Sequence, residues 1–334
     1  MRFDRKDVRL ALPSKGRLAD GGLSFLAEAG LRVHKPNPRQ FEATIPAMPG
    51  LAVLFQRVKD IVVSVRDGSV DFGITGWDVV SEYGAGNAEI LPLNKELGFG
   101  ECSLNVIVPE ALENTQRMAD LAVLRARLAR PLRVGTKFPN LTAEFFRQHG
   151  LEDTRLIEAE GTLEVAPAIG YADLIVDLVS TGTTLRDNRL TTLKDGQILR
   201  SQACLIANRS TLKARPEVLV MARELLEFIV AHLRATENVA IYVNMRGKSP
   251  RAIAERMFSK SVIGGLQGPT ISPVITPRGD SWYATHIIVQ RDLLGQAISE
   301  LRSVGGSGVV VTPVTYIFEE EPAECQAMLD ALQD

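Results

Sequence analysis

Short apolar segments alternate with helical patterns along the first two thirds of the chain, and the turns between them contain glycine. Val8–Pro13 is followed by a polar turn, Ser14–Arg17, and then by apolar residues at helical spacing. Val70–Ile74 and Leu174–Val179 are further apolar segments of the same kind. Strands that alternate with helices in this way predict an α/β fold with mostly parallel sheets.

The last part of the chain has a different order of elements. Ser249 and Pro250 are residue types that begin a helix, Asp292 is expected to cap a second helix, and Gly305 is expected to end it. Strands are predicted at Val239–Met245, Thr270–Thr276, Tyr283–Gln290 and Val309–Ile317. The resulting order, β-α-β-β-α-β, is that of a ferredoxin-like domain, with its boundary near Thr236.

The composition excludes several classes of protein. The chain has 334 residues, enough for two or three domains. Lys and Arg number 38 against 40 Asp and Glu, so the net charge of −2 gives no field that would hold nucleic acid or an anionic membrane. The longest run without a charge, Ser261–Pro277, contains three glycines and three prolines and does not suit a membrane span.

The amino-terminal sequence and the cysteines predict the compartment. Met1–Asp7 contains acidic residues and no apolar run follows it, which is not the pattern of a secretory signal. Cys102, Cys204 and Cys325 are far apart in sequence, against a disulfide framework or a cysteine-rich metal site. We therefore expect a cytoplasmic protein with no nucleic-acid partner and no membrane partner.

One segment, Ala172–Leu185, carries the clearest chemical signal. An apolar strand runs into Asp177, and the hydroxyl-rich loop Ser180–Thr184 follows around Gly182. Glycine lets successive backbone N–H groups converge and the hydroxyls add donors, so the loop suits a phosphate group. Asp177 is placed to accept hydrogen bonds from sugar hydroxyls, which makes a 5-phosphoribose a matching ligand. A strand followed by a capped turn is the alternative, and the lack of a lysine after the glycine excludes a P-loop.

Four further motifs occur in order along the chain: Leu12–Leu18, Asp71–Gly76, Glu164–Pro167 and Ala203–Ile206. Asp177–Leu185 is similar to the phosphoribosyl-pyrophosphate (PRPP) loop of phosphoribosyltransferases, although Leu178 stands where ordinary members carry a second acid. Taken together, the five motifs resemble those of the ATP phosphoribosyltransferase family, which catalyses the first step of histidine biosynthesis. The resemblance covers nearly the whole chain.

The resemblance implies a catalytic part of two α/β lobes, similar to type II periplasmic-binding proteins. One lobe is expected to contain residues 1–103 and 202–235, and the other residues 104–201 with the PRPP loop. Long-form members add a C-terminal ferredoxin-like (ACT-like) α+β domain that binds histidine as a feedback inhibitor. Residues 236–334 match this domain, since Gly268–Pro273 is similar to its turn and strand. The family also implies a homo-oligomer, both dimer and hexamer.

The implied reaction is the Mg²⁺-dependent transfer of 5-phosphoribosyl from PRPP to N1 of ATP with release of pyrophosphate, a pentosyltransferase reaction. Its nucleophile is a ring nitrogen of the substrate, so no Ser-His-Asp triad or activated cysteine is needed. The enzyme has to stabilise an oxocarbenium-like centre and the departing pyrophosphate through positioning and charge compensation. Mg²⁺ is expected on the pyrophosphate, with no direct protein ligand predicted apart from Asp177.

The resemblance also assigns roles to individual residues. Expected to bind PRPP are Asp173, Asp177, Ser180, Thr181, Gly182, Thr183 and Thr184. Expected to bind ATP are Ser14, Lys15, Gly16, Arg17, Gly76 and Glu164. Lys15, Arg17 and Asp177 are the candidates for catalysis. The plain alternatives are two solvated loop cations for Lys15 and Arg17, a tight turn for Gly76, and a surface carboxylate at a helix start for Glu164.

Two other functions are alternative interpretations of the same sequence features. A two-lobe fold also serves solute-binding proteins, but the phosphate loop and the start of the chain argue against that function. A transferase that couples PRPP to another base lacks the C-terminal domain and the other four motifs. The sequence leaves open which residues contact histidine, which oligomer is active, and which part of the cleft holds ATP.

Overall fold

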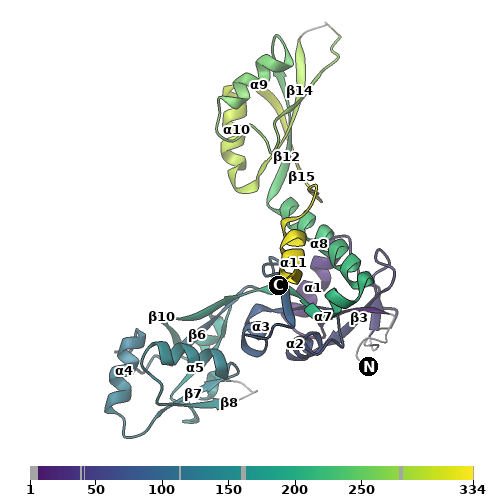
Figure 1. Cartoon of the computed structure of the whole chain (residues 1–334). Coiled ribbons are helices and arrows are strands. Elements are labelled where there is room, and N and C mark those ends of the chain that lie inside the picture. Colours follow the sequence, from purple (N-terminus) through teal and green to yellow (C-terminus); the bar gives the residue numbers. More distant parts are fainter. Residues whose placement is uncertain are drawn as a thin grey trace. The chain divides into compact units, whose positions relative to one another are not determined.

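The computed structural model describes residues 7–37, 40, 42–112, 114–158, 163–277 and 281–333 (Figure 1). The start of the chain, 1–6, where the charges argue against a secretory signal, lies outside the described residues. The chain forms two compact units: unit 1 is Met1–Ala27, Arg32–Ala222 and Ala327–Asp334, and unit 2 is Glu28–Leu31 and Arg223–Gln326. Within the described ranges, no helix is long and apolar enough to cross a membrane.

The first sheet of unit 1, named sheet A here, has six strands in the order β2-β3-β1-β4-β11-β5. The strands β1, β3 and β4 are parallel, whereas β2, β11 and β5 run antiparallel to their neighbours. The strands are β1 (Val8–Pro13), β2 (Glu42–Thr44), β3 (Leu51–Gln56), β4 (Phe72–Gly76), β5 (Ile90–Asn94) and β11 (Ala203–Asn208). The helices between them are α1 (Arg17–Glu28), α2 (Val58–Arg66) and α3 (Trp77–Tyr83).

Helix α2 packs directly against strand β4 of sheet A. Ile61, Val62 and Val65 share one face of α2 and are fully buried in a cluster with Val79 of α3. A Cβ added at Gly73 of β4 would lie 2.5 Å from the Ile61 Cγ2 atom. The helix therefore packs this closely on the strand because position 73 has no side chain.

The second sheet of unit 1, named sheet B, has the order β10-β6-β9-β7-β8. Here β7, β8 and β9 are parallel, while β6 and β10 complete the sheet in antiparallel pairing. The strands are β6 (Cys102–Pro109), β7 (Leu132–Thr136), β8 (Thr154–Glu158), β9 (Leu174–Val179) and β10 (Leu190–Ser201). The helices are α4 (Met118–Arg127), α5 (Pro139–Gln148), the short turn η1 (Leu163–Val165) and α6 (Thr183–Asp187).

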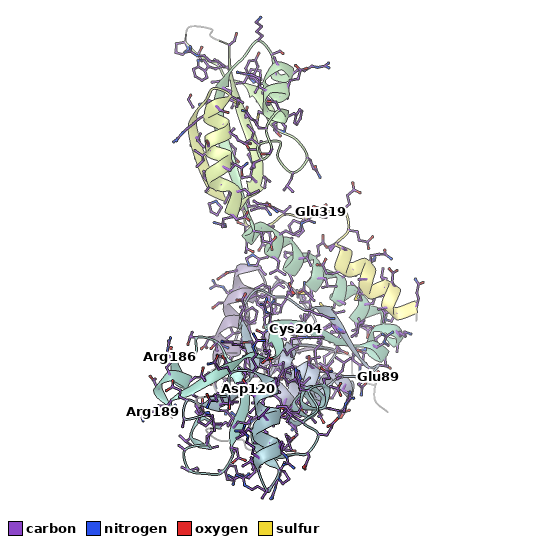
Figure 2. The ribbon with its side chains drawn as sticks, turned by 90° about the vertical axis from the view of Figure 1, so that its left-hand side faces the viewer. Glu89, Asp120, Arg186, Arg189, Cys204 and Glu319 are labelled. Atoms are coloured by element: carbon purple, nitrogen blue, oxygen red, sulfur yellow. The ribbon has the colours of Figure 1, made fainter. Side chains whose placement is uncertain are left out.

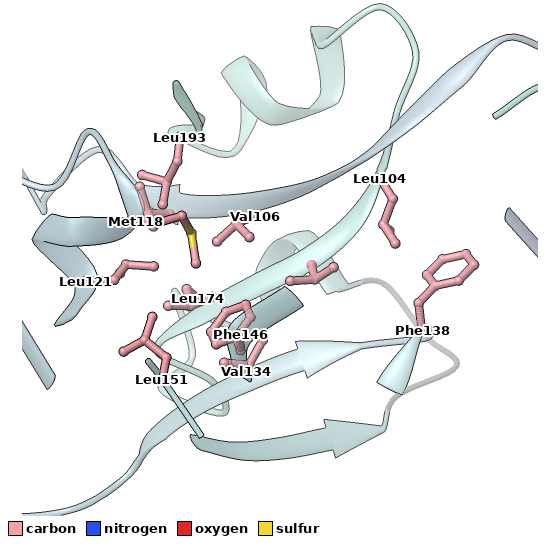
Figure 3. Close-up of a cluster of buried hydrophobic side chains, with 12 residues drawn as sticks. Leu104, Val106, Met118, Leu121, Val134, Phe138, Phe146, Leu151, Leu174 and Leu193 are labelled. Atoms are coloured by element: carbon pink, nitrogen blue, oxygen red, sulfur yellow. The ribbon is translucent and has the colours of Figure 1, made fainter. Parts of the chain in front are cut away.

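A separate hydrophobic core supports sheet B. Figure 3 shows this cluster, in which Val106 and Leu174 of the strands pack with Met118 and Leu121 of α4 and Phe146 of α5. The chain passes from sheet A to sheet B between β5 and β6 and returns between β10 and β11. Each sheet thus has its own core and its own set of parallel strands.

Unit 2 contains an antiparallel sheet of the order β13-β14-β12-β15. Its elements are β12 (Asn238–Arg246), α9 (Pro250–Phe258), β13 (Thr270–Pro273), β14 (Trp282–Gln290), the turn η2 (Arg291–Leu293), α10 (Leu294–Ser303) and β15 (Gly306–Pro313). This order confirms the ferredoxin-like prediction. With the two mixed sheets of unit 1, it also confirms the predicted class, an α/β catalytic part with a C-terminal α+β domain.

Three further helices complete the part of the chain that the structure describes: α7 (Arg209–Ala214), α8 (Pro216–Thr236) and α11 (Ala323–Gln333). Local patterns predicted some helix ends correctly and missed others. Ser249 caps α9 by accepting a hydrogen bond from the Ala252 N–H, as expected. Asp292 instead lies in the turn η2, and α10 begins at Leu294 with no side-chain cap, so that predicted cap is wrong.

The last strand of unit 2 also differs from its prediction. β15 is Gly306–Pro313, so it starts earlier and ends earlier than the apolar segment Val309–Ile317 suggests. Pro313 has no N–H for a further ladder bond, which ends the strand. The Ile317 N–H donates to the Ala231 carbonyl of α8 instead, so the apolar residues after Pro313 pack on a helix.

Candidate functional site

The chemistry-bearing segments of unit 1 follow the carboxyl ends of parallel strands. Ser14–Arg17 follows β1, and Trp77 and Asp78 follow β4 in sheet A. In sheet B, Lys137 comes directly after β7, and the loop Ser180–Thr184 spans the end of β9 and the start of α6. In open α/β sheets this edge is where ligands bind, so the topology gathers these segments where a substrate is expected.

Asp177 is the buried acid of the loop region. Its side chain is 15% exposed, its Oδ1 accepts the Leu178 N–H at 2.8 Å, and its Oδ2 lies 4.0 Å from the Lys137 Nζ. Burial raises the pKa of Asp177, an effect that Lys137 and the Leu178 N–H oppose and that nearby Glu164 reinforces. Glu164 and Lys137 therefore both act on the Asp177 carboxylate: the charge of Lys137 lowers its pKa and the charge of Glu164 raises it.

The loop after Asp177 presents hydroxyl groups to solvent. Ser180, Thr181, Thr183 and Thr184 are exposed, and the Thr181 and Thr183 Oγ1 atoms lie 3.3 Å apart. Gly182 has a φ of 70°, in the left-handed region that glycine adopts without strain, and α6 starts directly after it. The loop therefore offers several donors on a turn that only glycine forms easily.

The turn after β1 carries two cations. Ser14, Lys15, Gly16 and Arg17 are all exposed, and Gly16 has a φ of 81°. The Gly16 carbonyl accepts the Ala19 N–H at 2.9 Å, so the turn leads directly into α1. Lys15 and Arg17 consequently project from a fixed turn at the carboxyl end of β1.

Gly76 makes room for a buried carboxylate, Asp78. A Cβ at position 76 would meet the Asp78 Oδ1 atom. Asp78 is 4% exposed; its Oδ1 accepts the Ser201 hydroxyl at 2.5 Å, and its N–H donates to the Ser201 Oγ at 2.9 Å. Burial raises the pKa of Asp78. The hydrogen bond from the Ser201 hydroxyl, two local backbone N–H groups and the charge of Arg17 lower it, but by less.

A polar cavity of about 620 Å³ lies beside these residues. It is lined by Trp77, Lys95, Glu96, Glu101, Cys102, Ser103, Val179, Ser180, Gln197, Arg200, Ser201 and Gln202. The first hydroxyl residue of the loop, Ser180, is therefore part of its wall. Lys95 Nζ lies 4.8 Å above the centre of the Trp77 ring, which places a cation and an aromatic face on the same wall.

Asp173 is not brought to this site. Its carboxylate is bound by the guanidinium groups of Arg130 and Arg133 and by the Arg133 N–H, at 2.6 to 2.9 Å. These partners hold the pKa of Asp173 far below its usual range. The residue precedes β9, four positions before Asp177, which is about 13 Å at the rise of a strand. We therefore leave Asp173 out of the proposed PRPP site.

Several residues of the site did not stand out in the sequence. Lys137 is missed although it follows an apolar strand, Leu132–Thr136, in the same way as the other site segments. Ser201 carries no motif of its own, since its importance depends on the Asp78 carboxylate that it contacts. Arg186 lies in α6 and Arg189 just after it, so both follow the hydroxyl loop in sequence, and neither lines the cavity; Figure 2 labels both.

Known proteins are similar to this chain over most of its length. The family model described as "ATP phosphoribosyltransferase" matches residues 57–234, and the one described as "HisG, C-terminal domain" matches residues 235–316. "ATP phosphoribosyltransferase 2, chloroplastic" of Arabidopsis thaliana is 42% identical over 98% of this chain and 81% of its own length. "ATP phosphoribosyltransferase" of Rhodopseudomonas palustris is 36% identical over 93% of this chain and 94% of its own.

A solved structure shares the fold. The chain is similar to one in the "ATP phosphoribosyl transferase (HisG:HisZ) complex from Thermotoga maritima", with a TM-score of 0.53 and 24% sequence identity. The match covers 67% of this chain and 98% of the other. The likeness supports the two-sheet architecture of unit 1.

Proposed function

The chain belongs to the ATP phosphoribosyltransferase family in the long form with the C-terminal domain, and on that premise we propose which of its residues perform the reaction. The activity is that of the pentosyltransferase EC 2.4.2.17, the first step of histidine biosynthesis. We propose residues 1–103 with 202–235 as one catalytic lobe, 104–201 as the other, and 236–334 as the regulatory domain.

The hydroxyl loop after β9 is the proposed PRPP site. The observation that carries this proposal is the exposed set of hydroxyls around Gly182, directly beyond the buried carboxylate of Asp177. Ser180, Thr181, Gly182, Thr183 and Thr184 would hold the 5-phosphate through hydroxyl and backbone donors. Asp177, with Glu164 close by, would bind the ribose hydroxyls.

The cations after β1 are the proposed partners of the polyphosphate groups. Lys15 and Arg17 are exposed at the carboxyl end of β1. The charge of Arg17 lowers the pKa of both Asp78 and Cys102, and Cys102 lines the cavity. Ser14 and Gly16 would contribute the turn, and Gly76 the space for Asp78. We place ATP on this side because it needs positive charge for its triphosphate.

Catalysis then consists of positioning and charge compensation. Lys15 and Arg17 would stabilise the negative charge of the departing pyrophosphate, while Asp177 would hold the ribose and compensate the oxocarbenium-like C1. N1 of ATP attacks C1 as the C1–O bond to pyrophosphate breaks, so the ring nitrogen gains the bond and the oxygen takes the electron pair. No side chain has to be activated as a nucleophile.

Mg²⁺ is proposed to reach the site bound to PRPP. Within the described part of the chain, no group of three or more His, Cys, Asp or Glu side chains could hold a metal ion. A single carboxylate with 15% of its side chain exposed, as in Asp177, fits Mg²⁺ that is held mainly by phosphate oxygens and water. When bound, the ion would neutralise charge that develops on the pyrophosphate.

Unit 2 is proposed to bind histidine and so to inhibit the enzyme. The support is its ferredoxin-like sheet and the match of residues 235–316 to the C-terminal domain of the family.

Dimers and hexamers are proposed for the assembly. The cytoplasm is proposed as the location because the three cysteines are far apart in sequence, against a disulfide framework. Two relatives from Arabidopsis are chloroplastic by name, so fractionation of cells that make the protein tests this location.

Loss of the loop chemistry is expected to abolish turnover. We predict that Asp177→Asn or Thr181→Ala lowers the PRPP-dependent rate by about 100-fold or more, because the first removes the negative charge that compensates C1 and the second removes a hydroxyl group of the phosphate loop. The rate is measured as the ultraviolet absorbance of the product in a mixture of ATP, PRPP and Mg²⁺.

Thr191→Ala is the matched control, since Thr191 is an exposed threonine of β10 outside the loop. It should keep the wild-type rate and the wild-type Tm. Wild-type turnover in Thr181→Ala and Asp177→Asn would remove the PRPP assignment from this loop.

A further inference from the structure

A buried carboxylate from the sheet A side of unit 1 binds the start of a helix on the sheet B side. Glu82, near the end of α3, is 4% exposed. Its Oε1 accepts the Asn140 N–H at 2.8 Å and its Oε2 accepts the Leu141 N–H at 3.0 Å. The Asn140 side-chain amide donates in return to the Glu82 carbonyl at 3.3 Å. Three hydrogen bonds therefore join α3 to the first turn of α5.

Helix α5 depends on this carboxylate because its own sequence supplies no cap. Its N-cap residue is Phe138 and its first residue is Pro139, and the structure shows no side-chain cap from position 138. The first N–H groups of a helix need acceptors, and a carboxylate there is favoured by both hydrogen bonding and the helix dipole. Glu82 supplies the acceptors from 58 residues away in sequence.

The segment held in this way carries the cation that faces Asp177. Lys137 lies directly before Phe138, and its backbone carbonyl accepts the Tyr83 hydroxyl at 3.3 Å. Its Nζ lies 4.0 Å from the Asp177 Oδ2. Two adjacent residues of α3, Glu82 and Tyr83, thus fix the backbone on both sides of residue 138, and Lys137 is positioned through them.

We propose that Glu82 is a positioning residue for phosphoribosyl transfer: by holding the start of α5, it keeps the Lys137 ammonium beside Asp177 at the hydroxyl loop. The inference rests on the proposed PRPP site. Lys137 would compensate the Asp177 carboxylate and place a positive charge where PRPP brings its phosphate groups. Since α3 begins with Trp77 in the cavity wall, the same short helix connects both sides of the site.

Steady-state kinetics of four variants test the proposal in the full-length chain. Glu82→Ala and Lys137→Ala are each expected to lower kcat/KM for PRPP by about 10- to 100-fold, because a small displacement of a positioned group has effects of this size. Glu82→Gln, which keeps one oxygen acceptor, should lose less. The double variant Glu82→Ala/Lys137→Ala should be no worse than the poorer single variant, since both changes remove the same interaction.

Glu144→Gln is the control on the same helix. Glu144 is a half-exposed carboxylate of α5 that pairs only with neighbouring residues of that helix in the described structure, so its kinetics should stay wild-type. Melting temperatures of all variants separate a loss of positioning from a loss of folded protein, and Glu82→Gln serves if Glu82→Ala does not fold.

Two results would overturn the inference. One is a double variant whose loss is the product of the single losses; the other is a Glu82→Ala or Glu82→Gln enzyme with a lowered Tm but an unchanged kcat/KM for PRPP. If Asp177→Asn and Thr181→Ala lose turnover while the Lys137 variant does not, only this inference fails. If the loop variants themselves keep wild-type rates, the PRPP site fails first.

Discussion

Three aspartates of unit 1 show how position decides the behaviour of one residue type. Asp78 and Asp177 are removed from water, and burial raises the pKa of each. Asp173 lies between two guanidinium groups, and these hydrogen bonds lower its pKa. The first two carboxylates adjoin the proposed substrates, whereas Asp173 joins strand β9 to Arg130 and Arg133. The two carboxylates with raised pKa values lie at the proposed site, as expected for functional groups, whereas the one with a lowered pKa is held in an ion pair.

We predict that Asp173→Asn lowers the Tm by a few degrees at neutral pH. Because the folded pKa is depressed, the ionised carboxylate stabilises the native state above its unfolded pKa of about 3.8, and this contribution is lost as the pH falls below that value. The Tm difference between wild type and variant should therefore shrink in acid. The KM for PRPP should not change; a raised KM would return Asp173 to the substrate site.

At the scale of elements, glycines fix how closely helices and loops approach the sheets. Gly73 lets α2 pack on β4, and Gly182 turns the chain from β9 into α6. Gly76 leaves space for the Asp78 carboxylate at the start of α3. Glycine is needed for a different reason at each position: close packing at Gly73, a left-handed turn at Gly182, and room for a neighbouring side chain at Gly76. Only Gly182 is required by its backbone conformation.

Gly73→Ala should destabilise unit 1 by about 1–3 kcal/mol, the usual cost of forcing an extra methyl group into a packed core. The new Cβ would lie 2.5 Å from the Ile61 Cγ2 and 3.1 Å from the Val65 Cγ2. Gly22→Ala in α1 is the control, since its Cβ would only reach Phe99 at 3.8 Å, and alanine favours helix. Urea midpoints of both variants measure the difference; equal midpoints would show that α2 can move away.

At the scale of the whole molecule, the two compact units share helices. Residues up to Ala222 of α8 belong to unit 1 and those from Arg223 to unit 2, while the last residues of α11 belong to unit 1 again. The Arg209 guanidinium donates to the Ala331 carbonyl at the end of α11, and also to the Ala88 carbonyl. A cut after Thr236 therefore removes part of unit 1 together with the four-stranded sheet of unit 2.

Two truncations separate these effects. The chain ending at Pro322 retains all four strands of unit 2 and is expected to bind histidine, with a lowered Tm for unit 1 because α11 is gone. The chain ending at Thr236 should show the same lowered Tm and no histidine binding or inhibition. Calorimetric titration and the rate assay measure both, and histidine inhibition of the shorter chain would contradict the regulatory role of unit 2.

The amino-acid sequence by itself determined what depends on neighbouring residues: the alternation that makes α/β sheets, the β-α-β-β-α-β order of unit 2, the Ser249 cap, and the glycine and hydroxyls of the loop. Each of these arises within a few residues of chain, where spacing and residue type decide the backbone. The motifs that resemble those of the family also indicated which reaction the protein catalyses.

Only the tertiary structure decided which distant groups meet. Ser201 reaches Asp78 across 123 positions, Glu82 caps α5 across 58, and Arg130 binds Asp173 across 43. A carboxylate in a sequence shows no sign of whether it will be buried, paired or exposed, because its environment is built by elements that pack from elsewhere in the chain. For that physical reason the loop could be predicted, whereas the position of Asp173 and the roles of Lys137 and Glu82 could not.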